Sequence, residues 1–372
     1  MSEEPFTLKE SLFNQESVTG FAAAIQDAYP AFDVEAFFSA VFDEAWPDRA
    51  LMDRMRHVTF VLHDGLPADY RQAAALLIEA APNLAGGGFI DLVPCDYAAV
   101  YGLDDLATSI PLLEESTKLT SAEFAVRPFI EKYPEPMMAQ MLAWAGHEHA
   151  GVRRLASEGC RPRLPWGIRL QDLVADPAPI LPILEELKHD PEESVRRSVA
   201  NNLNDISKDH PDVVLNLLRR WNEEEPDDEQ IGWITNHALR TLIKAGDVQA
   251  LALLGYPADP QIVVREVRAE PGCIAIGEQI TLSYELESTG EKEQQLMVDY
   301  VVYLLRANGQ QTAKVFKHKK ITLQPGQVVQ IRKKQSFRPV TTRKYYPGAH
   351  AIAPQINGQI FDRVEFELTG LD

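Results

Sequence analysis

Apolar and polar positions along the chain follow two different periods, which change near residue 257. Up to about residue 256, apolar side chains recur at three- and four-residue spacing, which predicts amphipathic helices. After a two-proline linker, YPADP at 256–260, short runs rich in Val, Ile, Tyr and Phe alternate with polar positions, which predicts strands. We therefore expect two domains, at residues 1–256 and 261–372.

Proline and glycine divide the first domain into helical segments. The DPEE string at 190–193 is typical of a helix entry, with proline in the first turn and acids near the positive end of the helix dipole. The predicted helical segments are 34–63 (interrupted at Trp46-Pro47), 70–81, 121–132, 137–145, 150–159, 178–188, 194–206, 211–221 and 229–245.

The second domain has the pattern of a small antiparallel sandwich. Turn dipeptides such as Asn308-Gly309 and Asn357-Gly358 separate its short runs, and strand number and spacing favour an immunoglobulin-like topology. The inter-sheet cysteine pair of antibody domains is missing, since Cys273 stands alone. Predicted strands cover 280–286, 296–305, 314–323, 328–337 and 359–368.

A repeat of 43 residues runs through the later helices. Arg154, Arg197 and Arg240 occupy the same point of three units, and apolar residues recur at matched positions around them: Val152, Val195 and Ala238, and Ala156, Val199 and Leu242. A period of this length is typical of HEAT repeats, in which stacked helix pairs share a core and leave one face free. The fold class we predict is mainly α, a HEAT-like solenoid followed by an all-β immunoglobulin-like sandwich. Arginines in register suggest a polyanionic ligand.

Net charge argues against indiscriminate binding to nucleic acid, because the chain carries −19. The charge is uneven: residues 1–143 carry −15, residues 144–257 carry −6, and residues 258–372 carry +2. Binding to DNA would therefore need local basic faces rather than a basic protein.

The densest stretch of candidate chemistry is RRLASEGCRPRLPWG at 153–167. Arg154 and Glu158 share one helix face, and Gly159 follows as a C′ residue. The next loop holds Arg161, Arg163 and Trp166 between two prolines. The alternative is a surface pair of Arg154 with Glu158 and a tryptophan packed on the next repeat.

Two further groups carry polar side chains that suit a site. Asn201 and Asn202 suit phosphate or sugar contacts, and Asp205 ends the same helix; the alternative makes the asparagines inter-repeat hydrogen bonders and Asp205 a solvated helix end. Glu123 either belongs to the site or completes a capping box with Thr120 or Ser121.

These strings resemble the AlkC group of bacterial alkylation-repair DNA glycosylases, relatives of AlkD built on HEAT-like repeats. The resemblance rests on RRLASEGCRPRLPWG, VRRSVANNLNDISKDHPD and NHALRTLIKAGD, and covers most of the helical domain. It implies removal of 3-methyladenine and 3-methylcytosine from duplex DNA without turning the lesion out into a pocket, and a C-terminal immunoglobulin-like domain. The catalytic acids of the family would fall on Glu123, Glu158 and Asp205, and the aromatic on Trp166.

The chemistry suits these residue types. An N3-alkylated base is cationic and leaves readily, so the enzyme must supply negative charge near C1′ and a water. A carboxylate about 4 Å from a unit positive charge is worth roughly 4 kcal/mol at an effective dielectric near 20, which is roughly a thousandfold in rate. A tryptophan face adds about 1–2 kcal/mol when desolvated.

DNA contacts follow from the same expectation. Arginines of the helical domain would hold phosphates beside the lesion, since guanidinium geometry suits bidentate contact. Basic stretches at 314–320 and 341–346 would make a second contact; their alternative is a solvated strand face that protects an edge. The expected DNA-binding residues are Arg154, Arg161, Arg163, Arg197, Asn202, Arg240, Lys317, Lys319, Lys320, Arg343 and Lys344.

No metal or cofactor motif is present, so we expect cofactor-free hydrolysis. We also expect a monomer without a membrane segment or export signal, with three reduced cysteines, in the bacterial cytoplasm and used at the nucleoid. No lysine is expected in the acid cluster, so strand cleavage is not expected. The rival class is a non-enzymatic HEAT scaffold for protein binding, which the acidity of the chain favours.

Deletion of residues 261–372 is expected to weaken duplex binding markedly, because it removes the basic stretches of the sandwich. Fluorescence anisotropy with labelled duplex DNA measures this, and unchanged affinity refutes the assignment of those stretches to DNA.

Overall fold

The computed structural model describes residues 8–84, 88–340 and 343–370. The chain forms two compact units: Met1–Asp209 with Glu229–Ile234, and His210–Asp228 with Thr235–Asp372. The expected domain limits at 256 and 261 stay a prediction. Within the described ranges, no helix combines the length and apolarity that crossing a bilayer requires.

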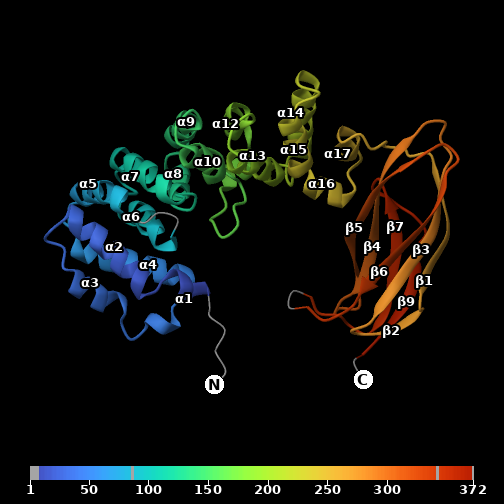
Figure 1. Ribbon diagram of the computed structural model, residues 1–372, viewed down its shortest axis with the longest axis horizontal. Helices are drawn as coiled ribbons and strands as arrows, with labels where there is room; N and C mark the ends of the chain where they lie inside the picture. The colour runs from blue at the N-terminus through green and yellow to red at the C-terminus, as the bar shows by residue number, and fades with distance from the viewer. Residues whose placement is uncertain (1–7, 85–87, 341–342, 371–372) are drawn as a thin grey trace. The chain divides into compact units, whose positions relative to one another are not determined.

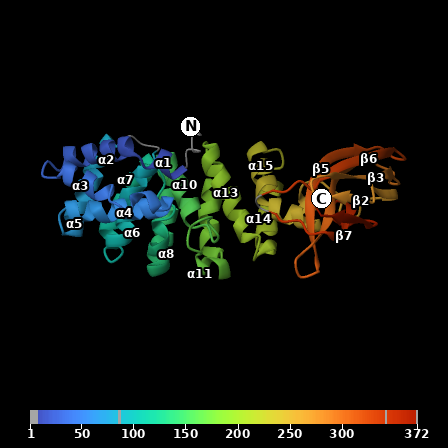
Figure 2. The same cartoon turned by 90° about the horizontal axis from the view of Figure 1, so that it is seen from below.

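The first unit is a stack of short helices (Figures 1 and 2). Short 3-10 turns lie between some of them: η1 (Trp46–Asp48), η2 (Ala81–Asn83), η3 (Phe89–Leu92) and η4 (Ala178–Ile180). The α-helices are α1 (Leu8–Leu12), α2 (Gln15–Ala28), α3 (Val34–Val41), α4 (Leu51–Gly65), α5 (Tyr70–Ala80), α6 (Val93–Tyr101), α7 (Leu106–Leu119), α8 (Val126–Lys132), α9 (Pro134–Ala145), α10 (Ala150–Gly159), α11 (Gln171–Ala175), α12 (Leu181–Leu187) and α13 (Glu193–Ile206), and α15 (Glu229–Ala238) begins here.

The 43-residue repeat is built into the packing of this stack. Helix α10 packs against α9 and against α13, its equivalent one repeat later. Val152 and Ala156 of α10 and Val195 and Val199 of α13 are all fully buried, as their matched positions predicted. The HEAT-like helical-repeat fold is therefore confirmed.

Several helix boundaries depart from the predictions, and α1, α2, α6, α7, α11 and α17 were not predicted. Helix α8 begins at Val126 rather than 121, and α13 begins at Glu193, so the proline at 191 lies outside its first turn. The predicted segment 229–245 is interrupted at Leu239, between α15 and α16 (Arg240–Ala245). Gly159 is the last residue of α10 rather than C′.

Close helix packing explains Gly159. A Cβ built there would lie 2.7 Å from Val126 Cγ2, which is closer than two carbon atoms can approach. The glycine lets α10 lie against α8. The sequence instead suggested that Gly159 is the C′ residue that ends the helix.

The second unit contains two sheets, the end of α15, and the helices α14 (Pro211–Glu224), α16 and α17 (Val248–Leu253). Its paired strands are antiparallel, except that β2 and β9 are parallel. One sheet has the order β1-β3-β6, and the other β2-β9-β7-β4-β5 with β8 beside β7. The strands are β1 (Ile262–Glu270), β2 (Cys273–Ala275), β3 (Gln279–Ser288), β4 (Gln294–Leu305), β5 (Gln311–Leu323), β6 (Val328–Ser336), β7 (Gly348–Ile356), β8 (Gln359–Ile360) and β9 (Val364–Thr369).

Alternating side chains of both sheets form the sandwich core. Ile280, Leu282 and Tyr284 of β3 share one buried cluster with Val298 and Tyr300 of β4, as period-two patterning requires. The predicted Asn357-Gly358 turn is confirmed: both residues have positive φ and connect β7 to β8. The single strand predicted at 359–368 is in fact β8 and β9, and β1, β2 and β7 were not predicted.

Alanine at two helical glycines is expected to change stability in opposite directions. Gly159→Ala should destabilise by about 1–3 kcal/mol, because the added methyl collides with Val126. Gly20→Ala, in α2 with no atom within 4 Å of its Cβ position, should stabilise by about 0.5–1 kcal/mol. Urea unfolding midpoints measure both. Equal effects at the two positions would contradict the close contact at Gly159.

Candidate active site

Two buried carboxylates end neighbouring helices of the first unit. Glu158 lies in the last turn of α10 and Asp205 in the last turn of α13, and they are 5% and 1% exposed. A helix C-terminus carries partial negative charge, so a carboxylate there is unfavourable unless a cation neutralises it. Burial makes that requirement stronger.

Arg161 supplies the neutralising charge. Its Nε donates to Asp205 Oδ2 at 2.9 Å, and its Nη1 donates to Glu158 Oε1 at 2.6 Å. Burial alone would lower the pKa of Arg161, but the two carboxylates outweigh burial and raise it. We expected Arg161 to hold a phosphate; with 6% exposure and its donors occupied, it instead bridges the acids.

Glu123 joins the same cluster through a second arginine. Arg154 Nη1 lies 2.9 Å from Glu123 Oε2, and Arg154 Nη2 lies 3.6 Å from Glu158 Oε1. Ser121 also donates to Glu123, at 3.0 Å. The structure thus brings the three predicted acids into one chain of ion pairs. The capping-box alternative for Glu123 is wrong, because α8 starts three residues later without a side-chain cap.

A lysine also belongs to this cluster, contrary to expectation. Lys208 Nζ lies 2.7 Å from Asp205 Oδ1. Arg163 is likewise paired, with Asp209, at 2.7 and 2.8 Å. Sequence reasoning missed Lys208, although it lies three residues beyond Asp205.

Trp166 lies on the loop between α10 and α11, the green segment that projects beside α10 and α13 in Figure 1. Its side chain is 79% exposed, so the alternative in which it packs on the next repeat is wrong. Its backbone has φ +66°, an uncommon conformation for an aromatic residue. With Ser121 and Phe124 it lines a cavity of about 190 Å³, which places it beside the Glu123 end of the cluster.

Arg127 holds this loop and was not predicted. It is fully buried on α8 and donates to the carbonyl oxygens of Gly159, Arg161 and Ile168 at 2.7–2.9 Å. Burial lowers its pKa to about 10. Its neighbours in sequence are apolar and nothing local marks it, so only its tertiary contacts reveal the role.

A cavity of about 380 Å³ opens between α10 and α13 beside the cluster. Arg154, Glu158, Arg197, Ser198 and Asn201 contribute to its lining. Glu158 Oε2 and Ser198 Oγ are buried and have no hydrogen-bond partner among the described residues. Both atoms belong to residues that line this one cavity.

Two other predicted contacts have local partners. Asn202 is fully buried and donates to Ser157 O at 2.8 Å, so the inter-repeat hydrogen bond is correct and direct DNA contact is not. Arg197 pairs with Glu193 on α13 and remains largely exposed. Arg240, in the second unit, donates to His237 O at 2.7 Å. A continuous row of the three repeat arginines stays a prediction.

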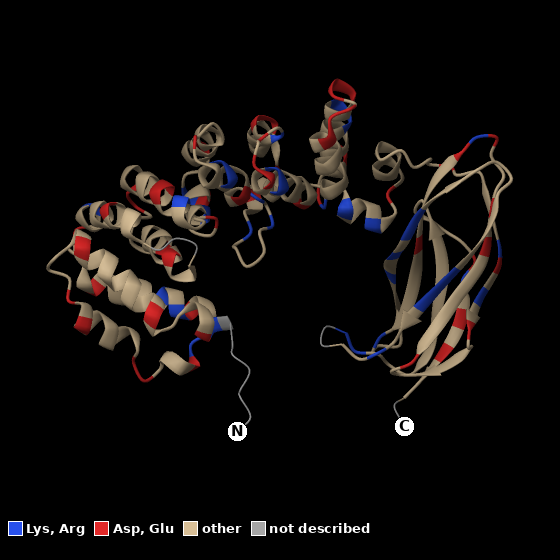
Figure 3. Cartoon of the chain, in the orientation of Figure 1, with Lys and Arg blue, Asp and Glu red and all other residues tan. Residues whose placement is uncertain are grey.

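The predicted basic stretches of the sandwich lie on β5 and just before β7, and Figure 3 shows basic residues along β5. Lys317, Lys319 and Lys320 are exposed on this edge strand, and Lys344 is exposed in the segment before β7. Arg343 lies over the Phe316 ring at 5.4 Å. Thr341 and Thr342 of the second stretch lie outside the described residues. The DNA and edge-protection roles of these stretches both stay predictions.

The chain combines a helical-repeat unit that contains a buried acid–arginine cluster with an immunoglobulin-like sandwich. Comparison with protein families identifies the class of proteins that has this combination. Residues 119–241 match the family model described as DNA alkylation repair enzyme, and residues 263–370 match that of the C-terminal Ig-like domain of YhaZ.

Two relatives match nearly the whole chain. The uncharacterised protein YhaZ of Bacillus subtilis (strain 168) is 41% identical over 361 residues, which cover 97% of this chain and 99% of that protein. The structure of Pseudomonas fluorescens alkylpurine DNA glycosylase AlkC, bound to DNA containing an abasic site analogue, is 42% identical with a TM-score of 0.88, covering 98% of this chain and 99% of that one. The chain therefore belongs to the DNA alkylation repair enzymes of the AlkC type.

Replacing Arg127 by lysine is expected to loosen the loop that carries Trp166. Lysine keeps the charge but cannot reach all three carbonyl oxygens, and the unsatisfied acceptors cost about 1–3 kcal/mol. Amide hydrogen exchange over residues 160–170 should accelerate. Arg71→Lys, at an exposed pair with Asp105, is the matched control. Unchanged exchange in Arg127→Lys would exclude the holding role.

Proposed function

We propose that this chain is a DNA glycosylase that hydrolyses the N-glycosidic bond of cationic N3-methylated bases, 3-methyladenine and 3-methylcytosine, in duplex DNA. The observation that carries the proposal is the linked cluster of Glu123, Glu158 and Asp205 beside an open cavity. Membership in the family supports the reaction class.

Glu158 is the residue we assign to the water. Its Oε1 is occupied by Arg161, whereas its Oε2 and the hydroxyl of Ser198 are buried without a hydrogen-bond partner among the described residues. A water held between them would be oriented by the serine and would give its proton to the carboxylate as it attacks C1′. Ser198 is a positioning residue in this scheme.

Asp205 is assigned to charge stabilisation. Both of its oxygens accept hydrogen bonds, from Arg161 and Lys208, so it is poorly placed to take a proton. Its fixed negative charge favours the oxocarbenium ion that develops as the base leaves. The two cations reduce this field, so the contribution is smaller than that of an isolated carboxylate. Glu123 lies at the other end of the cluster and holds Arg154.

Selectivity follows from charge rather than from enclosure. A cationic base needs no protonation, so the acids and the exposed face of Trp166 act on positive charge that is already present. We therefore propose that the lesion need not leave the helix stack.

Lys208 does not change the proposed reaction to strand cleavage. A Schiff-base amine must be free to attack C1′, whereas Lys208 Nζ is held by the Asp205 carboxylate at 2.7 Å. The enzyme is therefore proposed to be monofunctional. We also propose that it is a monomer, uses no metal or cofactor, and acts on nucleoid DNA in the cytoplasm.

DNA contacts are proposed for the arginines whose side chains reach the surface. Arg197 and Arg163 pair with partly exposed carboxylates, and such pairs exchange readily for phosphate. Arg154 lines the cavity and would meet the strand beside the lesion. Arg240 and the basic residues of the sandwich, Lys317, Lys319, Lys320, Arg343 and Lys344, would extend the contact.

Asp205→Asn is expected to keep duplex binding but to lower excision by on the order of a hundredfold to a thousandfold. The assay incubates dimethyl-sulfate-treated DNA with the protein and separates released bases by chromatography. Anisotropy on the same duplex measures binding.

Asp190→Asn is the matched control, because Asp190 is also buried and pairs with Arg153 at 2.5 and 3.1 Å. It should keep excision in the protein that remains folded. Equal loss of excision in both variants, or loss of binding in Asp205→Asn, would reassign Asp205 to structure. No release of either methylated base by the unaltered protein would favour the non-enzymatic scaffold.

A further inference from the structure

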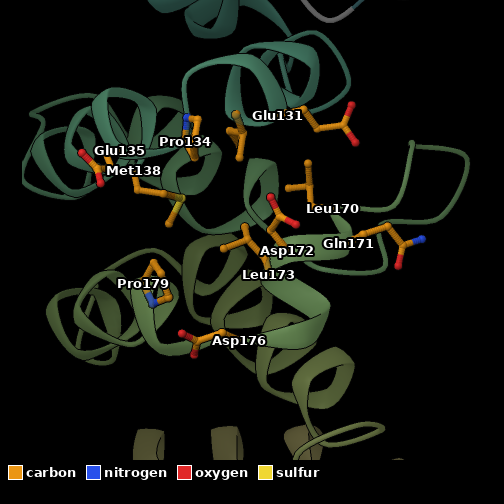
Figure 4. Close-up of a pocket in the computed structure, with 11 residues that line it drawn as sticks. Glu131, Pro134, Glu135, Met138, Leu170, Gln171, Asp172, Leu173, Asp176 and Pro179 are labelled. Carbon is orange, nitrogen blue, oxygen red and sulfur yellow. The ribbon is translucent and has the colours of Figure 1, made fainter.

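A third cavity of the first unit lies outside the acid–arginine cluster. It has a volume of about 590 Å³, within the range of roughly 300–1,000 Å³ typical of ligand sites. Helices α8, α9 and α11 and the turn η4 surround it. Met138 and Leu173 face each other across it, with Pro134 and Pro179 on either side (Figure 4).

The mouth of this cavity is acidic while its floor is apolar. Ile130, Leu170 and Leu173 are almost fully buried yet line it. Glu131, Glu135, Asp172 and Asp176 are exposed at its edge, and no ion pair joins any of them to a cation among the described residues. The cavity lining contains four carboxylates and no lysine or arginine. Glu131 also interacts electrostatically with Arg127 of the same helix, but the edge as a whole repels phosphate, so the occupant is not DNA.

We infer that this cavity binds a segment of a partner protein in which apolar side chains are flanked by lysine or arginine. The apolar floor rewards burial of leucine-like side chains. A single exposed ion pair is worth little, so recognition at this mouth requires several cations presented together. A basic peptide presents them on one chain, whereas a small amine presents one.

The cavity is also contiguous with the active-site loop. Leu170, which lines it, closes that loop by donating its N–H to Pro162 O at 3.3 Å. Arg127, which holds the loop, lies within one helical turn of Ile130 and Glu131 on α8. A docked segment would therefore lie against the base of the loop without covering Glu158 or Asp205. The inference does not depend on the proposed glycosylase reaction.

The test uses the full chain labelled with ¹³C at methionine methyl groups, because Met138 reports from inside the cavity. The probe is a synthetic peptide, acetyl-Gly-Lys-Lys-Leu-Leu-Lys-Lys-Gly-amide. It should shift the Met138 signal saturably, while a peptide with serines in place of leucines, or glutamates in place of lysines, should not. Substitution of Met138 by leucine in a separate sample assigns the signal.

Matched charge variants test the acidic mouth. Glu135→Gln with Asp172→Asn, both in first helical turns, should weaken peptide binding by on the order of fivefold. Glu16→Gln with Glu35→Gln makes the same charge change in the first turns of α2 and α3, away from the cavity, and should leave affinity unchanged.

Three results would overturn the proposal. They are no saturable shift of Met138, equal affinity in the two charge variants, and equal binding by the serine peptide. If butylammonium saturates the shift of the Met138 signal at the same concentration as the peptide, the cavity is a small-amine site and the peptide proposal is wrong. Excision of methylated bases, measured on the same samples, reports separately on the proposed reaction.

Discussion

The candidate site depends on one interaction, the buried bridge that Arg161 makes between Glu158 and Asp205. The two acids repel each other, and each stands at the negative end of its helix, so neither would be buried as an anion without a shared cation. Arg161 can be buried as a cation because both carboxylates neutralise its charge. Its backbone is in turn fixed by Arg127, which lies on a different helix. The acids, the bridge and the loop therefore form one mutually dependent unit.

Under the proposed function, this arrangement would let an acidic chain offer a site to DNA. Within the cluster, the charges of Glu123, Glu158 and Asp205 are matched by those of Arg154, Arg161 and Lys208. The site therefore presents local dipoles rather than a net negative charge to a phosphate chain. Stabilisation by fixed dipoles in a desolvated place is the strongest form of electrostatic catalysis. The overall charge of −19 is spread over other surfaces and is screened over about 8–10 Å at physiological salt.

The fold was largely predictable from the sequence, because its signals are local. The 43-residue repeat fixed the equivalence of α10 and α13, and the buried pairs at their matched positions follow from it. Strand β7 escaped prediction because most of its residues are buried, so period-two alternation is absent. Its alanines and Pro354 also lack the β-branched and aromatic pattern that identified the equally buried β4. The resemblance to the AlkC group was enough to name the three acids of the candidate site. It did not indicate which cations pair with them. The bridge from Arg161 to Asp205 spans 44 residues, and its geometry depends on how two repeats stack.

Burial does not explain the conformation of Trp166. A side chain 79% exposed in a left-handed backbone conformation contributes little to the stability of the free protein, and the conformation itself costs on the order of 1–3 kcal/mol. The loop is nevertheless fixed at both of its ends, by Arg127 and by the hydrogen bond from Leu170 to Pro162. Because this exposed ring does not stabilise the free protein, we infer that it contacts a binding partner. In the proposed reaction that partner is the damaged strand, where the ring would meet the cationic base as the Glu158–Asp205 pair meets the sugar.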